Sequence, residues 1–491
     1  MRILMAVSEA APFIKTGGLA DVVSALSLSL AQDGHRVRIA LPLYCVLDRT
    51  NLTALDGALS VSVGGHEELC TVYKTQLPGS NKKNPVVVYC IDHECFSRST
   101  VIYGTATEPV GDNPFRFTLF SRAVFQLCEK IKWYPDVLHA HDWQTALVPV
   151  FLKYTERHHH FAQTRSLLTI HNLAFQCRCS SDNFLYTELD PSVFSRDFEF
   201  YGAMNILKAG ISSADKINTV SPTYAQETKT QAFGCGLDGL LQYRSADYSG
   251  IVNGIDTAEW NPAHDSFIPK AYSHKNWRTG KAQAKEALQD ALDLPRDPYI
   301  PLIGWANRLS EQKGIGECFG AYYGAAYHIV QNLGVQMAVV ADGEPWCEKE
   351  LEYLSRTLDN FKAVPYKREL EHLLYAGSDL YLMPSSYEPC GLSQLYALQY
   401  GTVPLVRKTG GLTDTVENYN QNTGSGSGFV FNDLTPSALY RTVEWAVETY
   451  KNRPKHFEAL RVYGMQEDFS WKKSVKEYSA LYEELVNKTT V

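Results

Sequence analysis

Two copies of one short pattern stand near opposite ends of the chain. Residues 15–22 read Lys-Thr-Gly-Gly-Leu-Ala-Asp-Val and residues 408–415 read Lys-Thr-Gly-Gly-Leu-Thr-Asp-Thr, so only the sixth and eighth positions differ. Paired glycines between a strand and a helix let the backbone approach a ligand and direct its N–H groups toward it. Gly-Gly is also a common turn. Because both copies follow an apolar run and precede a helical pattern, we favour two loops that bind an anionic, nucleotide-like ligand.

Three further charged residues follow predicted strands. Arg308 and Lys313 come after one strand, where two cations suit a diphosphate, although such a pair is also common on a solvated loop. Glu388 lies in the segment 384–392, which directly follows the predicted strand 380–383 and precedes a helical pattern. A carboxylate at that corner can accept sugar hydroxyls or balance positive charge on an anomeric carbon; it can also merely offset a helix dipole.

A histidine-rich segment ends another predicted strand. His139, His141 and Asp142 lie within four positions, and His171 ends the next strand along the chain. Successive strand residues face opposite sides, so only part of this set could share one metal ion, and we favour roles without a metal. The chain contains neither a D-x-D pair nor the G-x-x-x-x-G-K-[ST] phosphate loop. We therefore expect Arg, Lys and backbone amides to neutralise phosphate charge, with no metal and no cofactor.

Composition excludes several classes of protein. The 491 residues carry 46 basic and 54 acidic side chains, a net charge of -8, which disfavours general binding to nucleic acid or an anionic membrane. The chain runs straight into its first strand without a leader, and no apolar stretch approaches the ~20 residues of a membrane span. The 11 cysteines are scattered and lack C-x-x-C pairs. We expect reduced thiols and a cytoplasmic location.

The elements that must position these residues alternate along the chain. The N-terminal half predicts strands at 3–7, 36–41, 86–90, 137–140, 167–170 and 216–220, with helices at 20–32, 115–130, 145–154 and 204–209. The pattern restarts after residues 254–256, with a helix at 279–292 and strands at 302–306, 336–340, 380–383 and 403–406. Such βαβ alternation predicts doubly wound parallel sheets. We predict domains at 1–248 and 249–468, and a helix over 469–491 that packs back toward the N-terminal domain.

Taken in order, these motifs resemble those of bacterial and plastid-type glycogen and starch synthases, over nearly the whole chain. The resemblance rests on residues 15–22, 139–143, 169–174, 220–224, 236–239, 253–256, 308–313, 388–392 and 408–412. It implies an α/β glycosyltransferase B-type fold, with two doubly wound Rossmann-like domains facing a deep cleft. It also implies transfer of glucose from ADP-glucose to the non-reducing end of an α-1,4-glucan (glycogen), with retention of configuration and without a metal ion.

The resemblance assigns roles residue by residue. The residues implied in the reaction are Glu388, His171, Arg308 and Lys313. Those implied in binding ADP-glucose are Lys15, Gly18, Asp21, Asp142, Asn253, Tyr366, Cys390, Gly391 and Leu392. Glu388 is expected to position the sugar and stabilise charge rather than act as a nucleophile. A retaining hydrolase needs two carboxylates about 5 Å apart, and the sequence shows no obvious second one.

Three positions depart from the family pattern. Cys177 stands where the family usually has glycine, and residues 341–343 read Ala-Asp-Gly in place of Gly-x-Gly. Tyr366, which resembles the adenine-stacking residue, lacks the usual acidic neighbour beside it in sequence, which bears on the choice of ADP over UDP.

The motifs disfavour other functions. A sugar-nucleotide epimerase or sucrose-type synthase on the same fold is disfavoured by the segment around His171 and the corner at Glu388. A phosphorylase would need a lysine context for pyridoxal phosphate that we do not find. A catalytically silent glucan-binding paralogue is disfavoured because Lys15, Arg308, Lys313 and Glu388 are all present.

Overall fold

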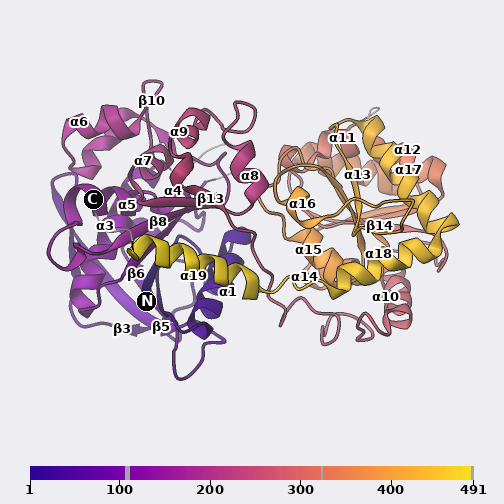
Figure 1. Cartoon of the computed structure of the whole chain (residues 1–491), viewed down its shortest axis with the longest axis horizontal. Coiled ribbons are helices and arrows are strands. Elements are labelled where there is room, and N and C mark those ends of the chain that lie inside the picture. The colour runs from indigo at the N-terminus through magenta and orange to yellow at the C-terminus, as the bar shows by residue number, and fades with distance from the viewer. Residues whose placement is uncertain (105–110, 322–323, 488–491) are drawn as a thin grey trace. The chain divides into compact units, whose positions relative to one another are not determined.

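The computed structural model describes residues 1–104, 111–321 and 324–487. The chain forms two compact units (Figure 1): unit 1 comprises residues 1–254 with the C-terminal segment from Trp471, and unit 2 comprises residues 255–470. None of the helices in the described ranges is long and apolar enough to cross a membrane.

Unit 1 is built on one large, mostly parallel sheet. Its order is β13 (Tyr248–Gly250), β12 (Lys216–Thr219), β8 (Arg165–Ile170), β7 (Val137–His141), β1 (Arg2–Ala6), β2 (Arg36–Pro42), β6 (Val87–Asp92), β5 (His66–Gln76) and β3 (Thr53–Ala54), with β4 (Leu59–Val63) paired to β5. The strands from β13 to β6 are parallel, and β3 to β5 add an antiparallel edge. A second, small sheet contains β10 (Glu199–Phe200), β11 (Ala203–Asn205) and β9 (Arg178–Cys179).

Helices cover this sheet. They are α1 (Gly18–Gln32), α2 (Glu94–Ser97), α3 (Asn113–Ile131), α4 (Asp142–Thr145), α5 (Leu147–Phe151), α6 (Pro191–Val193), α7 (Ile206–Ser213), α8 (Pro222–Glu227), α9 (Asp238–Tyr243) and the C-terminal α19 (Trp471–Asn487). The last helix lies beside α1, although the two are far apart in sequence (Figure 1). The buried stripe of α19, which includes Val475, Tyr478 and Tyr482, is the apolar face that its sequence predicts.

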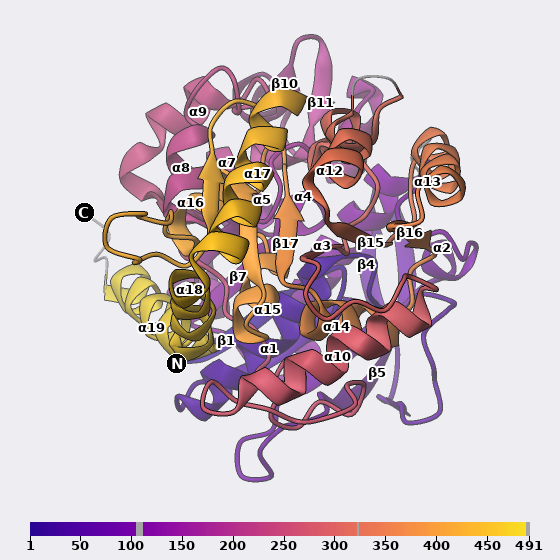
Figure 2. The same ribbon diagram turned by 90° about the vertical axis from the view of Figure 1, so that its right-hand side faces the viewer.

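Unit 2 is a six-stranded parallel sheet. Its order is β16 (Phe361–Val364), β15 (Gln336–Val340), β14 (Leu302–Trp305), β17 (Leu380–Met383), β18 (Val403–Arg407) and β19 (Phe429–Phe431). The surrounding helices are α10 (Trp277–Ala291), α11 (Ile315–Phe319), α12 (Ala325–Leu333), α13 (Pro345–Thr357), α14 (Arg368–Gly377), α15 (Ser393–Gln399), α16 (Gly410–Thr415), α17 (Pro436–Asn452) and α18 (Pro454–Gln466). Within this unit α10 packs beside α14 and α12 beside α17 (Figure 2).

Both faces of the unit 2 sheet are buried. Ile303 and Trp305 of β14 belong to the core beneath α12 and α17, whereas Leu302 belongs to the core beneath α10 and α14. A strand that is covered on both faces carries apolar residues at every position. This is why the central strands are visible in the sequence as uninterrupted apolar runs.

The order of strands identifies one special point in each sheet. In chain order the unit 2 strands run 3-2-1-4-5-6, and the parallel strands of unit 1 follow the same scheme with one more strand. Ligands of such sheets bind beyond the carboxyl ends of the two strands where the order reverses. Those pairs are β1 and β7 in unit 1, and β14 and β17 in unit 2. The doubly wound α/β architecture predicted for both halves is confirmed.

Candidate functional site

The loop after β1 is organised by a buried carboxylate. Glu9 is 3% exposed. Its Oε2 accepts hydrogen bonds from the backbone N–H of Thr16 at 2.5 Å and of Gly17 at 3.3 Å, and its Oε1 accepts one from the Thr16 hydroxyl at 2.7 Å. These bonds fix the loop that leads into α1, whose first residue is Gly18. A helix N-terminus with exposed amides is a favourable site for an anion.

The charged side chains of this loop pair with each other. Lys15 Nζ lies 2.8 Å from Asp21 Oδ2, and the lysine side chain is 54% exposed. An exposed ion pair of this kind adds little stability, so the ammonium can turn toward an anion at small cost. Sequence reasoning identified Lys15, Gly18 and Asp21 but missed Glu9. The available signal was a carboxylate three positions after the end of the buried strand β1.

Asp142 directly follows β7, the other strand at the reversal point of unit 1, and is the first residue of α4. Its Oδ1 accepts hydrogen bonds from the backbone N–H of His171 at 2.7 Å and of Asn172 at 3.4 Å. Burial raises the pKa of Asp142 to about 7, against the lowering effect of these two bonds. The residue also has a φ of 54°, in the left-handed region that few non-glycine residues adopt. Asp142 and His171, predicted separately from two strand ends, are thus brought together.

The histidines form a cluster of neutral rings. His141 Nδ1 lies 3.0 Å from His171 Nε2, and the two rings stack with an interplanar angle of 26°. Burial lowers the pKa of His171 to about 3 and lowers the pKa of His139 and His141 well below the usual range. These rings therefore act as hydrogen-bonding groups rather than cations at neutral pH. Across the described residues, no three His, Cys, Asp or Glu side chains are placed to hold a metal ion.

The remaining unit 1 candidate, Asn253, follows β13. Asn253 is buried, and its Oδ1 has no hydrogen-bond partner within the part of the chain that the structure describes. A buried amide oxygen without a partner is uncommon and fits a group that bonds a ligand.

In unit 2 the reversal point brings a cation and a carboxylate together. Lys313 lies in the loop after β14 and Glu388 in the loop after β17, and Nζ is 2.5 Å from Oε2. The Glu388 side chain is 6% exposed, and the Ser385 hydroxyl donates to the same oxygen at 3.0 Å. The two loops are also joined by backbone, since the N–H of Ser386 donates to the carbonyl of Gln312 at 2.8 Å. The exposed Arg308 lies in the same loop as Lys313.

The second Gly-Gly copy, Gly410 and Gly411, packs against the backbone of the segment that contains Glu388. The N–H of Gly411 donates to the Glu388 carbonyl at 3.0 Å. A Cβ on Gly410 would lie 2.0 Å from the Glu388 carbonyl oxygen, and one on Gly411 would lie 2.0 Å from that of Cys390. By contrast, a Cβ on Gly17 of the first copy would meet nothing within 4 Å. The two copies thus have similar sequences but different surroundings. Gly410 and Gly411 allow their backbone to contact that of Glu388 and Cys390, whereas Gly17 has open space where a Cβ would lie.

The backbone of residues 390–392 turns sharply beside Glu388. Gly391 has a φ of 73°, which favours glycine, and α15 begins one residue after Leu392. Cys390 is 5% exposed and is one of 11 free cysteines. The turn joins the segment that contains Glu388 to the start of α15.

Tyr366 is held at the ends of neighbouring strands. Its N–H donates to Asp342 Oδ2 at 3.2 Å, and its hydroxyl donates to Glu371 Oε2 at 2.8 Å. The ring is 48% exposed, so it can stack on a base. The acidic partner that the residues beside Tyr366 lack is therefore supplied by Glu371 of α14, five positions further along the chain. Gly343 of the Ala-Asp-Gly segment is needed sterically, since a Cβ there would lie 2.2 Å from the Leu309 carbonyl oxygen.

Cys177, the other departure from the family pattern, has a φ of 51°. This left-handed conformation explains why glycine is the usual residue there. The loop nevertheless keeps its hydrogen bonds, because the Gln176 side chain accepts from Asn205 Nδ2 at 2.8 Å and donates to the Leu173 carbonyl at 3.0 Å.

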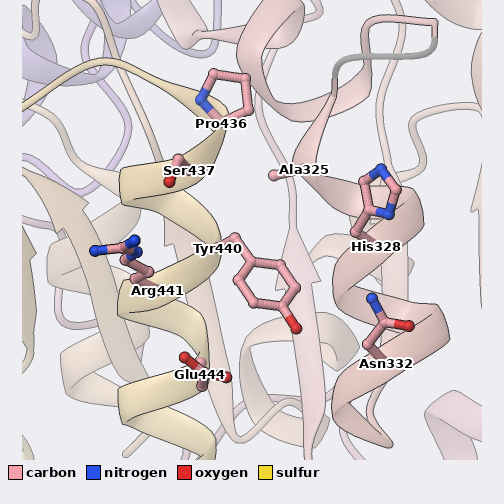
Figure 3. A pocket seen from close by; sticks show the side chains of 8 residues that line it. All are labelled: Ala325, His328, Asn332, Pro436, Ser437, Tyr440, Arg441 and Glu444. Carbon is pink, nitrogen blue, oxygen red and sulfur yellow. The ribbon is translucent and has the colours of Figure 1, made fainter.

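An open pocket of about 360 Å³ lies elsewhere in unit 2 (Figure 3). Its walls are α12 and α17, with His328 and Asn332 on one helix and Tyr440, Arg441 and Glu444 on the other. None of the residues predicted from the motifs lines this pocket. We therefore take the loops at the reversal point of each unit, and not this groove, as the candidate functional regions.

Comparisons with known proteins identify the family of the chain. The family model described as "Starch synthase catalytic domain" matches residues 2–243, and that described as "Glycosyl transferases group 1" matches residues 296–459. The chain is 46% identical to the glycogen synthase of Treponema denticola over 99% of both chains. It is 40% identical to glycogen synthase 2 of Geobacter metallireducens over 98% of both.

Solved structures give the same result. The catalytic domain of starch synthase IV from Arabidopsis thaliana, bound to ADP and acarbose, has a TM-score of 0.89 and 32% identity over 99% of both chains. The sucrose-phosphate synthase of Thermosynechococcus elongatus has a TM-score of 0.62 at 16% identity, covering 99% of this chain and 100% of that one, a likeness of fold alone.

Proposed function

The chain belongs to the glycogen synthases, glycosyltransferases of the B-type fold, and we propose that it transfers glucose from ADP-glucose through the residues at its two reversal points. The observation that carries the proposal is the buried pairing of Lys313 with Glu388 at the reversal point of unit 2. The acceptor is the non-reducing end of an α-1,4-glucan, and the anomeric configuration is retained.

In this proposal unit 2 binds the donor. Arg308 and Lys313 contact the diphosphate, and Lys313 has three N–H donors, so it can keep its bond to Glu388 while it binds a phosphate oxygen. Glu388 and the amides of residues 390–392 bind glucose hydroxyls. Tyr366 stacks on adenine, with its ring held by Glu371.

Unit 1 contributes the remaining contacts. Lys15 and the N–H of Gly18 bind donor phosphate, and Asp21 pairs with Lys15 in the absence of phosphate. Asp142, His171 and Asn253 bind the sugar. Glu9 acts on the loop rather than on the ligand, since it directs the Thr16 and Gly17 amides inward and leaves that of Gly18 for the donor.

The chemistry follows from where charge develops. Negative charge grows on the diphosphate as the bond to the anomeric carbon breaks, and preorganised cations and amides there lower the barrier by about 3 kcal/mol each. Arg308, Lys313 and Lys15 supply that charge, so we expect transfer without a metal ion. The Glu388 carboxylate is neutralised by Lys313 and bonded to Ser385, which makes it a weak nucleophile and a good positioning group.

The test is transfer of labelled glucose to glycogen, from ADP-glucose and UDP-glucose in parallel, with a chelator present and Glu388→Ala as the comparison. We expect chelator-resistant transfer from ADP-glucose that the variant lacks. Transfer from UDP-glucose alone would refute the donor assignment but keep the reaction. Loss of transfer on chelation would refute metal independence, and full activity of Glu388→Ala would refute the site.

The proposal has a rival that the same experiment separates. A folded chain that binds glycogen but transfers glucose from neither donor would be a silent glucan-binding paralogue.

We also propose a cytoplasmic location with no nucleic-acid or membrane partner, because all 11 cysteines are free and the net charge is -8.

A further inference from the structure

We propose that Tyr482 of the C-terminal helix α19 positions His171, although it does not contact that residue, through the buried rings of His139 and His141 on β7. The inference rests on the proposed function, since it takes His171 to bind the sugar. It assigns to α19 a part in catalysis besides its part in packing.

The chain of contacts begins on α19. Tyr482 Oη lies 2.8 Å from His139 Nδ1, and His139 Nε2 lies 2.6 Å from the hydroxyl of Thr169 on the neighbouring strand. Thr169 donates to Asn218 Oδ1 at 2.5 Å. Asn218 Nδ2 then donates to Tyr478 Oη at 3.1 Å, which returns the chain to α19 one turn before Tyr482.

These partners fix the position of each proton. The single hydroxyl proton of Thr169 is given to Asn218, so Thr169 must accept from His139 Nε2–H. A neutral imidazole carries one N–H, and His139 is neutral because burial lowers its pKa well below the usual range. Its Nδ1 is therefore an acceptor, and the Tyr482 hydroxyl is the donor to it. Without Tyr482, that acceptor would be buried and unbonded.

The influence of His139 reaches the proposed sugar site through one more ring. The centroids of the His139 and His141 rings are 4.1 Å apart, and His141 Nδ1 lies 3.0 Å from His171 Nε2. His139 and His141 have no exposed surface. His141 Nε2 has no hydrogen-bond partner within the described ranges, so the ring is held by stacking and by its bond to His171. A shift of His139 therefore moves His141, and with it the only imidazole of the three that is not fully buried.

The helix itself is anchored against movement. Ser479 bonds His35 and Asp33, both at 2.9 Å, and Glu484 lies 2.5 Å from the buried Lys216 of β12. These contacts lie on both sides of Tyr482 in sequence. The hydroxyl of Tyr482 is consequently presented from a rigid element, which is what a positioning group needs.

The test compares Tyr482→Phe with Tyr248→Phe. Both substitutions remove one buried tyrosine hydroxyl from unit 1, but that of Tyr248 bonds two threonines, Thr228 at 2.9 Å and Thr219, rather than a histidine. Thermal unfolding of both variants measures the loss of stability that follows from removal of a buried hydroxyl. Transfer kinetics and ¹⁵N-histidine NMR of the full chain then measure what is specific to Tyr482.

We expect wild-type His139 to be protonated at Nε2. In Tyr482→Phe, the signals of both His139 and His171 should shift and kcat should fall about threefold to tenfold with little change in KM for the donor, because misalignment of reacting groups slows chemistry more than binding. Tyr248→Phe should leave the His171 signals and kcat unchanged.

Three results would overturn the inference: His139 protonated at Nδ1 in the wild type, His171 signals unchanged in Tyr482→Phe, or equal kcat losses in the two variants. The NMR result holds even if the wild-type chain transfers no glucose, so failure of the inference and failure of the proposed function are distinguishable.

Discussion

Lys313 and Glu388 form a buried ion pair across 75 positions of the chain, with Nζ 2.5 Å from Oε2. The pair exists because β14 and β17 are neighbours at the point where the strand order of unit 2 reverses. In the proposed reaction Lys313 contacts the leaving diphosphate and Glu388 contacts the sugar. Their contact ties the positions of both groups to one another.

Removal of Lys313 should harm both stability and activity. Lys313→Met leaves the Glu388 carboxylate buried without its cation, and we expect unit 2 to lose about 3 kcal/mol of unfolding free energy. Denaturant unfolding and transfer assays check this. The double variant Lys313→Met/Glu388→Gln should recover most of the stability and none of the activity. Recovery of activity in the double variant would show that the pair serves folding alone.

Ionisation of Asp142 should destabilise unit 1. Its pKa is raised from near 4 to about 7, so the folded state holds the proton more tightly, and the contribution present below pH 4 is lost as pH rises through 7. The loss is about 1.4 kcal/mol per pH unit in that range. Asp142→Asn keeps an acceptor for the two backbone N–H groups and should remove this dependence. Amide hydrogen exchange of β7 and β8 at pH 5 and 8 measures it; equal pH dependence in both proteins would contradict the assignment.

The buried histidines should act in the opposite direction. Burial lowers the pKa of His139 and His141 well below the ordinary 6.5, so both rings are neutral when folded and gain protons on unfolding in acid. Stability present above pH 6.5 is then lost as pH falls, by about 1.4 kcal/mol per pH unit for each ring. His139→Gln should reduce the change in the unfolding free energy of unit 1 between pH 6.5 and 5 by about 1.4 kcal/mol per pH unit, the contribution of one bound proton. An unchanged slope would mean that His139 is already protonated in the folded state.

The sequence predicted most of the fold because the central strands are buried on both faces. The predicted strands that form β15 and β17 match to the residue, and the other strand ends differ by at most two positions. The strand β5 was missed, because it is half-exposed and carries polar residues at alternate positions. The predicted helix over 145–154 is interrupted between α4 and α5. Continuous apolar runs in the sequence indicate buried strands, whereas elements with one solvent-exposed face have a weaker hydrophobic pattern.

The candidate site could be predicted only in part. Motif residues such as Lys313 and Glu388 were found one by one, but their contact depends on which strands are neighbours. Glu9 was missed because its role depends on the path of the loop that returns to it. Tyr482 belongs to a helix whose periodicity predicts packing and gives no sign that one hydroxyl meets a histidine.

The two Gly-Gly copies offer a matched test of what each glycine does. Gly410→Ala, at the position that corresponds to Gly17, would place a methyl group 2.0 Å from the Glu388 carbonyl oxygen, so the two backbone segments must separate. We expect a loss of more than about 3 kcal/mol in unit 2 stability, and a large fall in transfer activity. Gly17→Ala is the control, since it has an extended φ of -158° and open space around the new methyl group, and it should leave stability nearly unchanged. Unfolding curves of the two variants decide the matter: similar losses at both positions would contradict a backbone contact specific to the second copy.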